Sequence, residues 1–217
     1  MKKSSDKSKA KPATTSSVRI IGGQFKRRSI AFMDADGLRP TPDRLRETLF
    51  NWLLADIHDA RVLDSCAGSG VLGFEALSRG AAHCTLIEIN NVQSKLLAQS
   101  AEQLQIEGKN YQIIGGAAEE VLNQKGNFEQ PFDIVFIDPP YAQNLWQPIL
   151  HALINNHLIT ADTLIYLESD KDLSAQLDDL IDNLNEENKN QNLTRFECLK
   201  QTKVGQVVAG LYRLESS

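Results

Sequence analysis

Four consecutive residues, Asp138-Pro139-Pro140-Tyr141, carry the side chains with the clearest chemical potential in this chain. They directly follow the apolar run 132–137, which is short enough to be a buried strand. A carboxylate and an aromatic ring are therefore expected at the carboxyl end of a strand, where open α/β sheets bind ligands. An amine-bearing ring could stack on Tyr141 while its NH2 group donates to Asp138 and to the Pro139 carbonyl. The four residues are thus candidate catalytic residues for chemistry at an exocyclic amine of a nucleobase, although Asp-Pro pairs also occur in turns that are merely stiff.

A second segment with chemical potential begins at Asp64 and continues through a glycine-rich run to Gly73. Its glycines allow a tight turn and let a ligand approach the backbone at the amino end of the next helix. The glycine spacing G-x-G-x-x-G also occurs in nicotinamide- and flavin-binding folds, so it is weak evidence alone. Asp64 favours a different cofactor, because a carboxylate before the glycines would repel a pyrophosphate but would suit the ammonium group of S-adenosylmethionine.

Two further strand ends complete the predicted cofactor site. Glu88 lies 18 residues after Gly70 and can accept both ribose hydroxyls, while the small residues 115–118 can present backbone amides to an adenine edge. The cofactor is expected to be S-adenosylmethionine, with S-adenosylhomocysteine as product and no metal. The predicted cofactor-binding residues are Asp64, Cys66, Ala67, Gly68, Gly70, Glu88, Ile89, Ala117 and Ala118, with Thr41 and Arg44 as residues that could close over the cofactor.

The pattern around these motifs predicts an α/β protein. Strands are expected at Arg61–Ser65, Cys84–Ile89, Tyr111–Ile114, Phe132–Ile137 and Thr163–Leu167, with helices after the first four near 72–79, 92–105, 118–124 and 145–155. This alternation indicates a parallel, doubly wound sheet with right-handed crossovers. A helix near 173–184, an Asn-rich loop at 185–192 and an antiparallel hairpin of 195–201 and 207–214 follow. We therefore predict a Rossmann-like class I methyltransferase fold, a mostly parallel seven-stranded sheet ending in an antiparallel hairpin.

The N-terminal part is expected to form an extension of this fold. Residues 18–23 and 28–32 are typical of a small β-hairpin, and Thr41 can cap a helix whose first turn contains Pro42. We divide the chain into a disordered basic tail at 1–17, a hairpin extension at 18–42 and a methyltransferase domain at 43–217.

The charge distribution supports a localised polyanion contact. The net charge of −5 conceals +7 in residues 1–50, from 12 Lys and Arg against 5 Asp and Glu, and −12 in the remainder, from 11 against 23. An ion pair of Arg44 or Arg46 with Asp43 or Glu47 is the alternative to a phosphate contact. The candidate phosphate contacts are Arg19, Lys26, Arg27, Arg28, Arg39 and Arg46.

Composition excludes several other classes of protein. The 217 residues fit one domain, and no apolar stretch approaches the roughly 20 residues that span a bilayer. The three cysteines, Cys66, Cys84 and Cys198, are odd in number and lack C-x-x-C spacing, which indicates a reducing cytoplasm rather than a disulfide framework or zinc site.

These motifs together resemble those of the bacterial RsmD family of small-subunit (16S) ribosomal RNA guanine-N2 methyltransferases. The resemblance covers about residues 18–214, and its most specific part is the run from Leu38 to Glu47. The segments that carry it are Arg19–Gly23, Leu38–Thr41, Asp43–Leu53, Asp64–Gly73 with Glu75-Ala76, Asp138–Tyr141 and Gly205–Val207.

The resemblance implies methyl transfer to the exocyclic N2 of one guanine in 16S ribosomal RNA, within an assembled or partly assembled small subunit. It also implies that the extension at 18–42 binds RNA, with the six candidate phosphate contacts as RNA-binding residues. We expect the protein to act as a monomer away from membranes. Three alternatives remain: an adenine-N6 methyltransferase of DNA or RNA, a nicotinamide-dependent oxidoreductase, which Asp64 argues against, and a catalytically silent ribosome-assembly factor.

Overall fold

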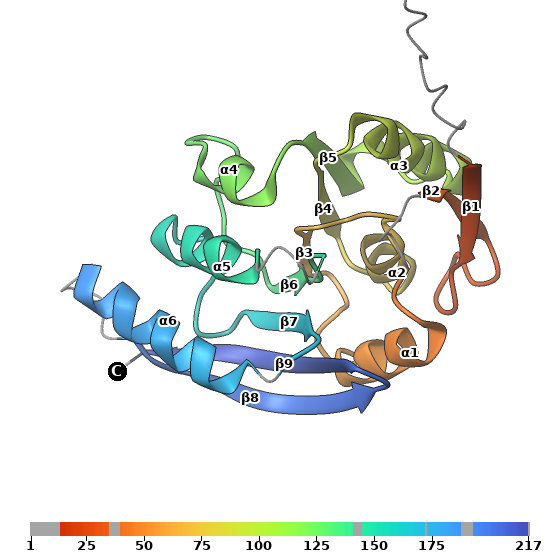
Figure 1. Ribbon diagram of the computed structural model, residues 1–217. Coiled ribbons are helices and arrows are strands. Elements are labelled where there is room, and N and C mark those ends of the chain that lie inside the picture. Colours follow the sequence, from red (N-terminus) through yellow and green to blue (C-terminus); the bar gives the residue numbers. More distant parts are fainter. Residues whose placement is uncertain (1–13, 35–39, 141–144, 172, 188–192, 217) are drawn as a thin grey trace, which may run out of the picture.

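The computed structural model describes residues 14–34, 40–140, 145–171, 173–187 and 193–216. At its centre lies a seven-stranded sheet in the order β5-β4-β3-β6-β7-β9-β8 (Figure 1). The first five of these strands run parallel, and β9 is antiparallel to both β7 and β8. Its strands are β3 (Arg61–Asp64), β4 (His83–Glu88), β5 (Tyr111–Gly115), β6 (Ile134–Ile137), β7 (Leu164–Ser169), β8 (Leu193–Val204) and β9 (Val207–Ser216). The predicted fold class is confirmed.

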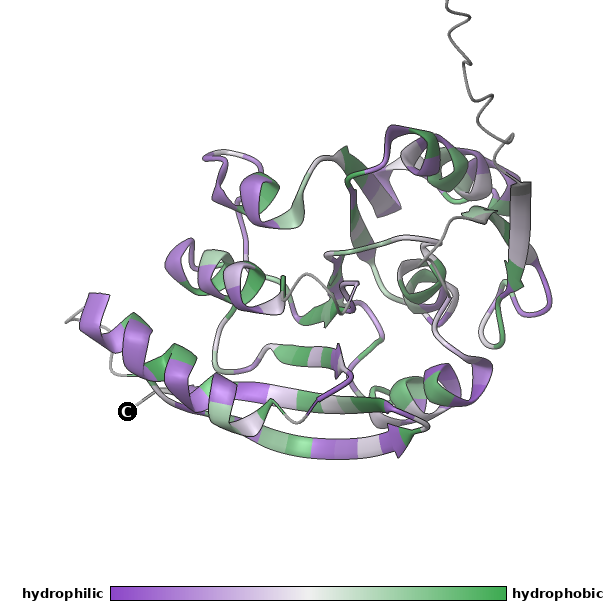
Figure 2. Ribbon diagram, in the orientation of Figure 1, coloured by the Kyte–Doolittle hydropathy of each residue, from purple (hydrophilic) through white to green (hydrophobic). Residues whose placement is uncertain are grey.

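Helices cover both faces of this sheet. One face packs against α1 (Asp43–Trp52), α2 (Val71–Ser78) and α3 (Asn91–Leu104). The other packs against α4 (Ala118–Asn123), α5 (Trp146–Asn155) and α6 (Ser174–Glu187). Figure 2 shows apolar residues on the central strands and mixed character along the helices. A parallel sheet covered on both faces needs apolar residues on both sides of each strand, which is why these strands read as continuous apolar runs.

The strand order fixes where a ligand can bind. From β3 the chain builds outward through β4 and β5 in one direction and through β6 and β7 in the other. Adjacent parallel strands whose connections depart to opposite sides leave a crevice at their carboxyl ends. This switch point lies between β3, which ends at Asp64, and β6, which is followed directly by Asp138.

The N-terminal extension forms its own two-stranded sheet. β1 (Thr14–Arg19) pairs antiparallel with β2 (Ser29–Asp34), and β2 packs against α3. The strand begins at Thr14, so residues 14–17, which we expected in the disordered tail, pair with β2 instead. β-branched Thr14 and Thr15 suit this extended conformation. Residues 1–13 of the predicted tail lie outside the described residues.

A loop between β1 and β2 docks the extension onto the end of α2. The backbone N–H of Gln24 donates to the Ser78 carbonyl at 2.7 Å, and that of Phe25 donates to Ser78 Oγ at 2.9 Å. Gly23 adopts φ +71°, and a Cβ at this position would lie 1.8 Å from the same carbonyl oxygen. Only glycine therefore allows the loop to approach the helix this closely.

Two helix boundaries differ from the prediction. Thr41 does not cap α1: the N-cap is Pro42, and no side chain makes a capping hydrogen bond. α6 continues to Glu187, into the segment predicted as an Asn-rich loop, and the Asn185 side chain bonds the backbone N–H and carbonyl of Leu193 at the start of β8. The rest of that loop, residues 188–192, lies outside the described part of the chain. Across the described segments no helix is both long and apolar enough for a membrane crossing.

Candidate active site

Three carboxylates meet at the switch point of the sheet. Burial raises the pKa of Asp64 to about 7, and the charges of Asp138 and Glu88 add to this effect. Charges that act on one another in this way lie close together, so the ends of β3, β4 and β6 form a single acidic site. The sequence-based prediction that these three strand ends share one edge of the sheet therefore agrees with the geometry.

Asp64 holds the glycine-rich loop against the start of α2. Its side chain is 3% exposed, and Oδ2 accepts a hydrogen bond from the Gly73 N–H at 3.0 Å. The loop is also attached to the neighbouring strands, because Ser65 donates to the Phe136 carbonyl through both N–H and Oγ, at 3.1 and 2.8 Å. Gly70, at φ +74°, has no room for a Cβ, which would lie 2.4 Å from a Leu97 methyl group.

Glu88 holds the opposite side of the same loop. Its Oε2 accepts from the Gly68 N–H and its Oε1 from the Asn90 N–H, each at 2.8 Å. Beside it, the apolar side chain of Ile89 is 70% exposed. Ala117 N-caps α4 and Ala118 begins that helix, so the residues predicted for the cofactor lie along the ends of β3, β4 and β5.

Cys66 lies in the loop as a protonated thiol. Burial raises its pKa to about 12, and the nearby charges of Asp64, Asp138 and Glu88 act in the same direction. A thiol in this state is a poor nucleophile. Ala67 is buried beside it, and its N–H donates to the Ile87 carbonyl at 2.9 Å.

Asp138 is the carboxylate in this cluster that keeps part of its surface accessible. Its Oδ2 accepts a hydrogen bond from the Thr41 hydroxyl at 3.1 Å. Burial raises the pKa of Asp138 to about 6, and the bond from Thr41 opposes that rise. Asp138 is therefore mostly ionised at neutral pH. Pro139 is buried and Pro140 exposed, while Tyr141 lies outside the described residues.

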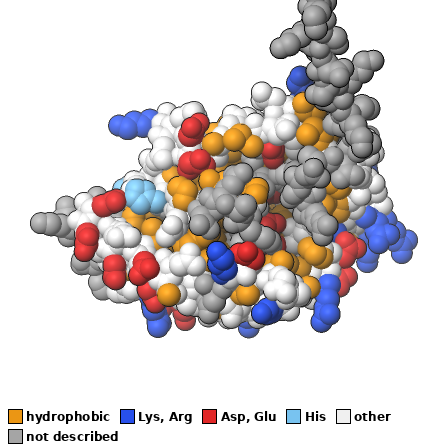
Figure 3. Space-filling model, in the orientation of Figure 1, with side chains coloured by type: hydrophobic (Ala, Val, Ile, Leu, Met, Phe, Trp, Pro, Cys, Tyr) orange, Lys and Arg blue, Asp and Glu red, His pale blue; other side chains and the backbone are white. Residues whose placement is uncertain are grey.

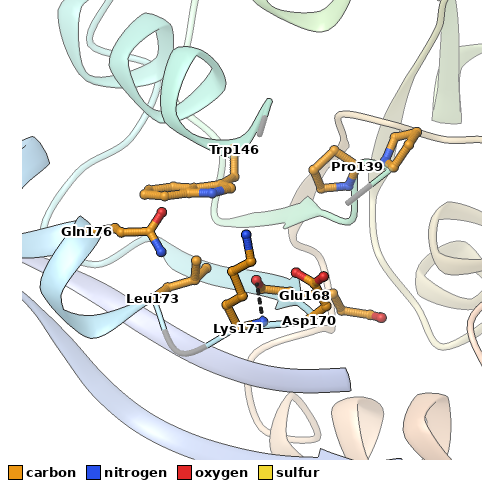
Figure 4. A pocket seen from close by; sticks show the side chains of 9 residues that line it. Pro139, Trp146, Glu168, Asp170, Lys171, Leu173 and Gln176 are labelled. Atoms are coloured by element: carbon orange, nitrogen blue, oxygen red, sulfur yellow. Dashed lines mark hydrogen bonds between the residues drawn. The ribbon is translucent and has the colours of Figure 1, made fainter. Parts of the chain in front are cut away.

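A narrow cleft adjoins Asp138 between the ends of β6 and β7 (Figure 4). Pro139 and Pro140 form one side, and Trp146 at the start of α5 forms another. Lys171 extends into the space between Trp146 and Pro139 from the segment after β7. The cleft therefore places apolar rings and a cation next to Pro139, the residue that follows Asp138.

Arg46 is not available to RNA, which corrects its predicted role. Its side chain is fully buried and pairs with Glu75 Oε1 at 3.0 Å and with Asp43 Oδ1 at 2.5 Å. It also donates to the carbonyls of Arg19 and Thr41, each at 3.0 Å. The alternative that we left open, an internal ion pair with Asp43, is the one present. The reason is that Glu75 is itself fully buried and needs a counter-charge.

The other predicted RNA-binding residues lie mostly on the surface. Arg19, Lys26 and Arg27 are exposed, and Figure 3 shows basic side chains on the side of the molecule that carries the β1–β2 loop. Arg28 is exposed too, but its guanidinium donates to the carbonyls of Gln103 and Leu104 at the end of α3. Arg39 lies outside the described residues.

The two residues predicted to close over the cofactor differ in their surroundings. Thr41 is buried and donates its hydroxyl to Asp138, so it faces the acidic site. Arg44 is exposed on the first turn of α1, and its contact with the cofactor stays a prediction.

Sequence reasoning gave Glu75 no role, although it supports the extension. Glu75 accepts from the backbone N–H groups of Ile21 and Gly22 and from Arg79 Nε, as well as from Arg46. The available signal was a single carboxylate within the apolar run 71–77, since a charge on such a helix requires a partner.

Comparison with known proteins agrees with this geometry. The family described as conserved hypothetical protein 95 matches residues 18–200. Ribosomal RNA small subunit methyltransferase D of Escherichia coli K12 is 45% identical over 153 residues, which cover 70% of this chain and 75% of that protein. The protein of the same name from Haemophilus influenzae is 40% identical over 162 residues, which cover 74% and 83% of the two chains. The solved structure of yhhF from Escherichia coli superposes with a TM-score of 0.74 and 38% identity, covering 93% of this chain and all of that one.

The sheet order and the carboxylates at its switch point define a class I methyltransferase fold. Within that class, the chain belongs to the family of the ribosomal RNA small subunit methyltransferases D, the RsmD family whose motifs its sequence resembles.

Proposed function

We propose that this protein transfers a methyl group from S-adenosylmethionine to the exocyclic N2 of a guanine in 16S ribosomal RNA of the small subunit. The names of its relatives support an RNA substrate in that subunit. The observation that carries the chemical part is an accessible, ionised Asp138 beside the two carboxylates at the neighbouring strand ends.

The acidic site suits a cationic cofactor. Burial and the charges of Asp138 and Glu88 oppose ionisation of Asp64, so a bound ligand with positive charge would stabilise the Asp64 carboxylate. S-adenosylmethionine carries an ammonium and a sulfonium group, and when bound it supplies an electrophilic methyl group. Asp64 would bind the ammonium, Glu88 would accept the ribose hydroxyls with its remaining lone pairs, and exposed Ile89 would cover one face of the adenine.

Asp138 would then direct the amine of the target base. The N2 lone pair of guanine is delocalised into the ring, so it must be made pyramidal before it can react. Hydrogen bonds from N2–H to Asp138 Oδ1 and to the Pro139 carbonyl would favour that geometry, and the carboxylate would stabilise positive charge on nitrogen. Asp138 is positioned to accept the proton that the nitrogen would lose after receiving the methyl group that the cofactor supplies.

The target base must leave its stack to reach this site. Tyr141 would stack on the base, which is worth about 1–3 kcal/mol in single-strand binders. The exposed cations Arg19, Lys26 and Arg27 would contact phosphates, which give affinity but little sequence information.

Methylation with labelled cofactor tests this proposal. Purified protein is incubated with small ribosomal subunits, naked 16S RNA or DNA, and the products are digested to nucleosides. We expect labelled N2-methylguanosine from the subunits. Labelled N6-methyladenine would favour the alternative activity, and no product from any substrate would favour a non-enzymatic assembly factor.

The matched variants are Asp138→Ala and Asp56→Ala. Asp56 is an exposed carboxylate in the turn after α1, so its removal serves as the control. We expect Asp138→Ala to abolish transfer with cofactor affinity nearly unchanged by calorimetry, and Asp56→Ala to behave as wild type. Undiminished turnover of Asp138→Ala would refute the assigned role.

A further inference from the structure

The hydroxyl of Thr41 reaches the catalytic carboxylate from 97 positions earlier in the chain. Thr41 is 5% exposed, and its hydroxyl makes no capping bond to α1. It lies between Pro40 and Pro42, and a residue before proline is restricted to extended backbone conformations. Local sequence therefore fixes the backbone from which this hydroxyl points to Asp138.

The Arg46 guanidinium holds that backbone in place. Its Nε donates to the Thr41 carbonyl at 3.0 Å, while Nη1 and Nη2 bind Glu75 and Asp43. Because the guanidinium is planar, fixing one side of it sets the direction of the Nε–H bond. Glu75 is fixed in turn by Arg79 Nε at 3.1 Å. A continuous series of contacts thus runs from α2 through Arg46 and Thr41 to Asp138.

We propose that Thr41 and Arg46 are positioning residues for methyl transfer. Thr41 occupies Oδ2 of Asp138 and so turns Oδ1, which accepts no hydrogen bond among the described residues, toward the substrate amine. Arg46 acts through Thr41 by holding its carbonyl. This inference rests on the proposed function and changes two predicted roles, that of Thr41 as a cofactor contact and that of Arg46 as an RNA contact.

The same hydrogen bond affects the charge state of Asp138. A hydroxyl that donates to a carboxylate favours its ionised form, and Thr41 is the donor that Asp138 has within the described residues. Burial opposes ionisation of the same carboxyl. Asp64 and Cys66 interact electrostatically with Asp138, and Glu88 interacts with both of them. Glu168, Asp170 and Lys171 line the cleft at Pro139, the next residue along the chain. Loss of the hydroxyl is therefore expected to move the acid limb of the rate profile to higher pH.

Thr41→Val and Thr41→Ser form the test pair. Valine keeps the shape of threonine without the hydroxyl, whereas serine keeps the hydroxyl. A hydrogen bond to a charged group corresponds to about a 10- to 100-fold change in rate. We expect Thr41→Val to lower kcat by about that factor and to shift the pH profile upward, with cofactor affinity unchanged by calorimetry. Thr41→Ser should restore most of kcat and the wild-type profile.

A double-mutant cycle tests the part assigned to Arg46. Arg46→Lys keeps the charge but loses the planar fork, and its fold is checked by thermal melting. If Arg46 acts through Thr41, Arg46→Lys together with Thr41→Val has the kcat of Thr41→Val alone. Losses that simply multiply would overturn this part of the proposal.

A measurement without RNA separates this inference from the proposed function. Titration of the Asp138 carboxyl by ¹³C NMR should move to higher pH in Thr41→Val whatever the substrate is. An unchanged titration together with unchanged kcat would overturn the positioning role even if wild-type enzyme methylates the small subunit. Weakened cofactor binding with unchanged kcat would overturn it as well, and would return Thr41 to the cofactor site.

Discussion

Replacing Asp64 by asparagine should stabilise the ligand-free protein, with an effect that depends on pH. Asp64 is nearly inaccessible and its pKa rises from 3.8 to about 7, because of burial and the neighbouring carboxylates. At 1.36 kcal/mol per pKa unit, that difference corresponds to a cost of about 4 kcal/mol when Asp64 is ionised in the folded state. Asparagine keeps an oxygen that can accept from the Gly73 N–H but carries no charge.

The direction follows from proton linkage. A carboxyl whose pKa is raised by folding ionises more readily in the unfolded chain, so each increase in pH between 3.8 and about 7 favours unfolding. Below that window Asp64 is protonated in both the folded and the unfolded state, so it does not lower the free energy of unfolding. Above it the cost is complete and constant. The advantage of Asp64→Asn should therefore grow from near zero at about pH 4 to about 4 kcal/mol at pH 8.

Urea denaturation at pH 4.5, 6 and 8 measures this difference. Asp56→Asn, at an exposed carboxylate, is the control and should show little pH-dependent difference from wild type. Added S-adenosylmethionine should stabilise wild type more than Asp64→Asn. The stabilisation by a ligand grows with the logarithm of its concentration relative to its Kd, and asparagine lacks the charge that binds the ammonium group, so the Kd of the variant should be higher. An advantage of Asp64→Asn that is the same at all three pH values would refute the reasoning.

Other perturbations test the docking of the extension. Arg46→Met should cost about 3–5 kcal/mol in urea unfolding, because it leaves Glu75 buried without its main counter-charge. Gly23→Ala should detach the β1–β2 loop from α2, since its Cβ would lie 1.8 Å from the Ser78 carbonyl oxygen. Faster hydrogen exchange at the β1–β2 amides, with exchange in the seven-stranded sheet unchanged, would show this detachment. Lys26→Gln should weaken RNA binding at low salt and reduce the slope of log affinity against log salt by about 1, as expected for one lost phosphate contact.

The central sheet and its ligand-binding edge could be predicted because their signals are local. Each parallel strand is a short apolar run, and Asp64, Glu88 and Asp138 directly end or follow such runs. Parallel strands place their carboxyl ends together whatever the loops do. These three carboxylates, far apart in sequence, therefore lie together at the edge of the sheet that the pattern predicted.

The contacts of Thr41 and Arg46 could not be predicted in the same way. Before a helix, threonine is a common cap, and among apolar residues in a basic segment, arginine suggests a phosphate contact. The role of Thr41 depends on Asp138, 97 positions away, and the role of Arg46 depends on Glu75, 29 positions away. No local pattern encodes such pairings. The first strand was also predicted to begin at residue 18, whereas β1 begins at Thr14. Residues 14–17 are serines and threonines, a composition that is typical of a disordered tail.

The buried ion pair of Arg46 and Glu75 is better explained by geometry than by stability. Apolar residues of similar volume are often as stabilising as a buried ion pair, so stability alone would not require these charges. The charges instead fix the positions of two segments: Arg46 binds the Arg19 carbonyl at the end of β1 and the carbonyl of Thr41, whose hydroxyl contacts Asp138. The surface proposed to bind RNA and the carboxylate proposed to direct the amine are therefore held by one guanidinium. A base presented by RNA on the extension would reach a carboxylate whose orientation the same contact has set.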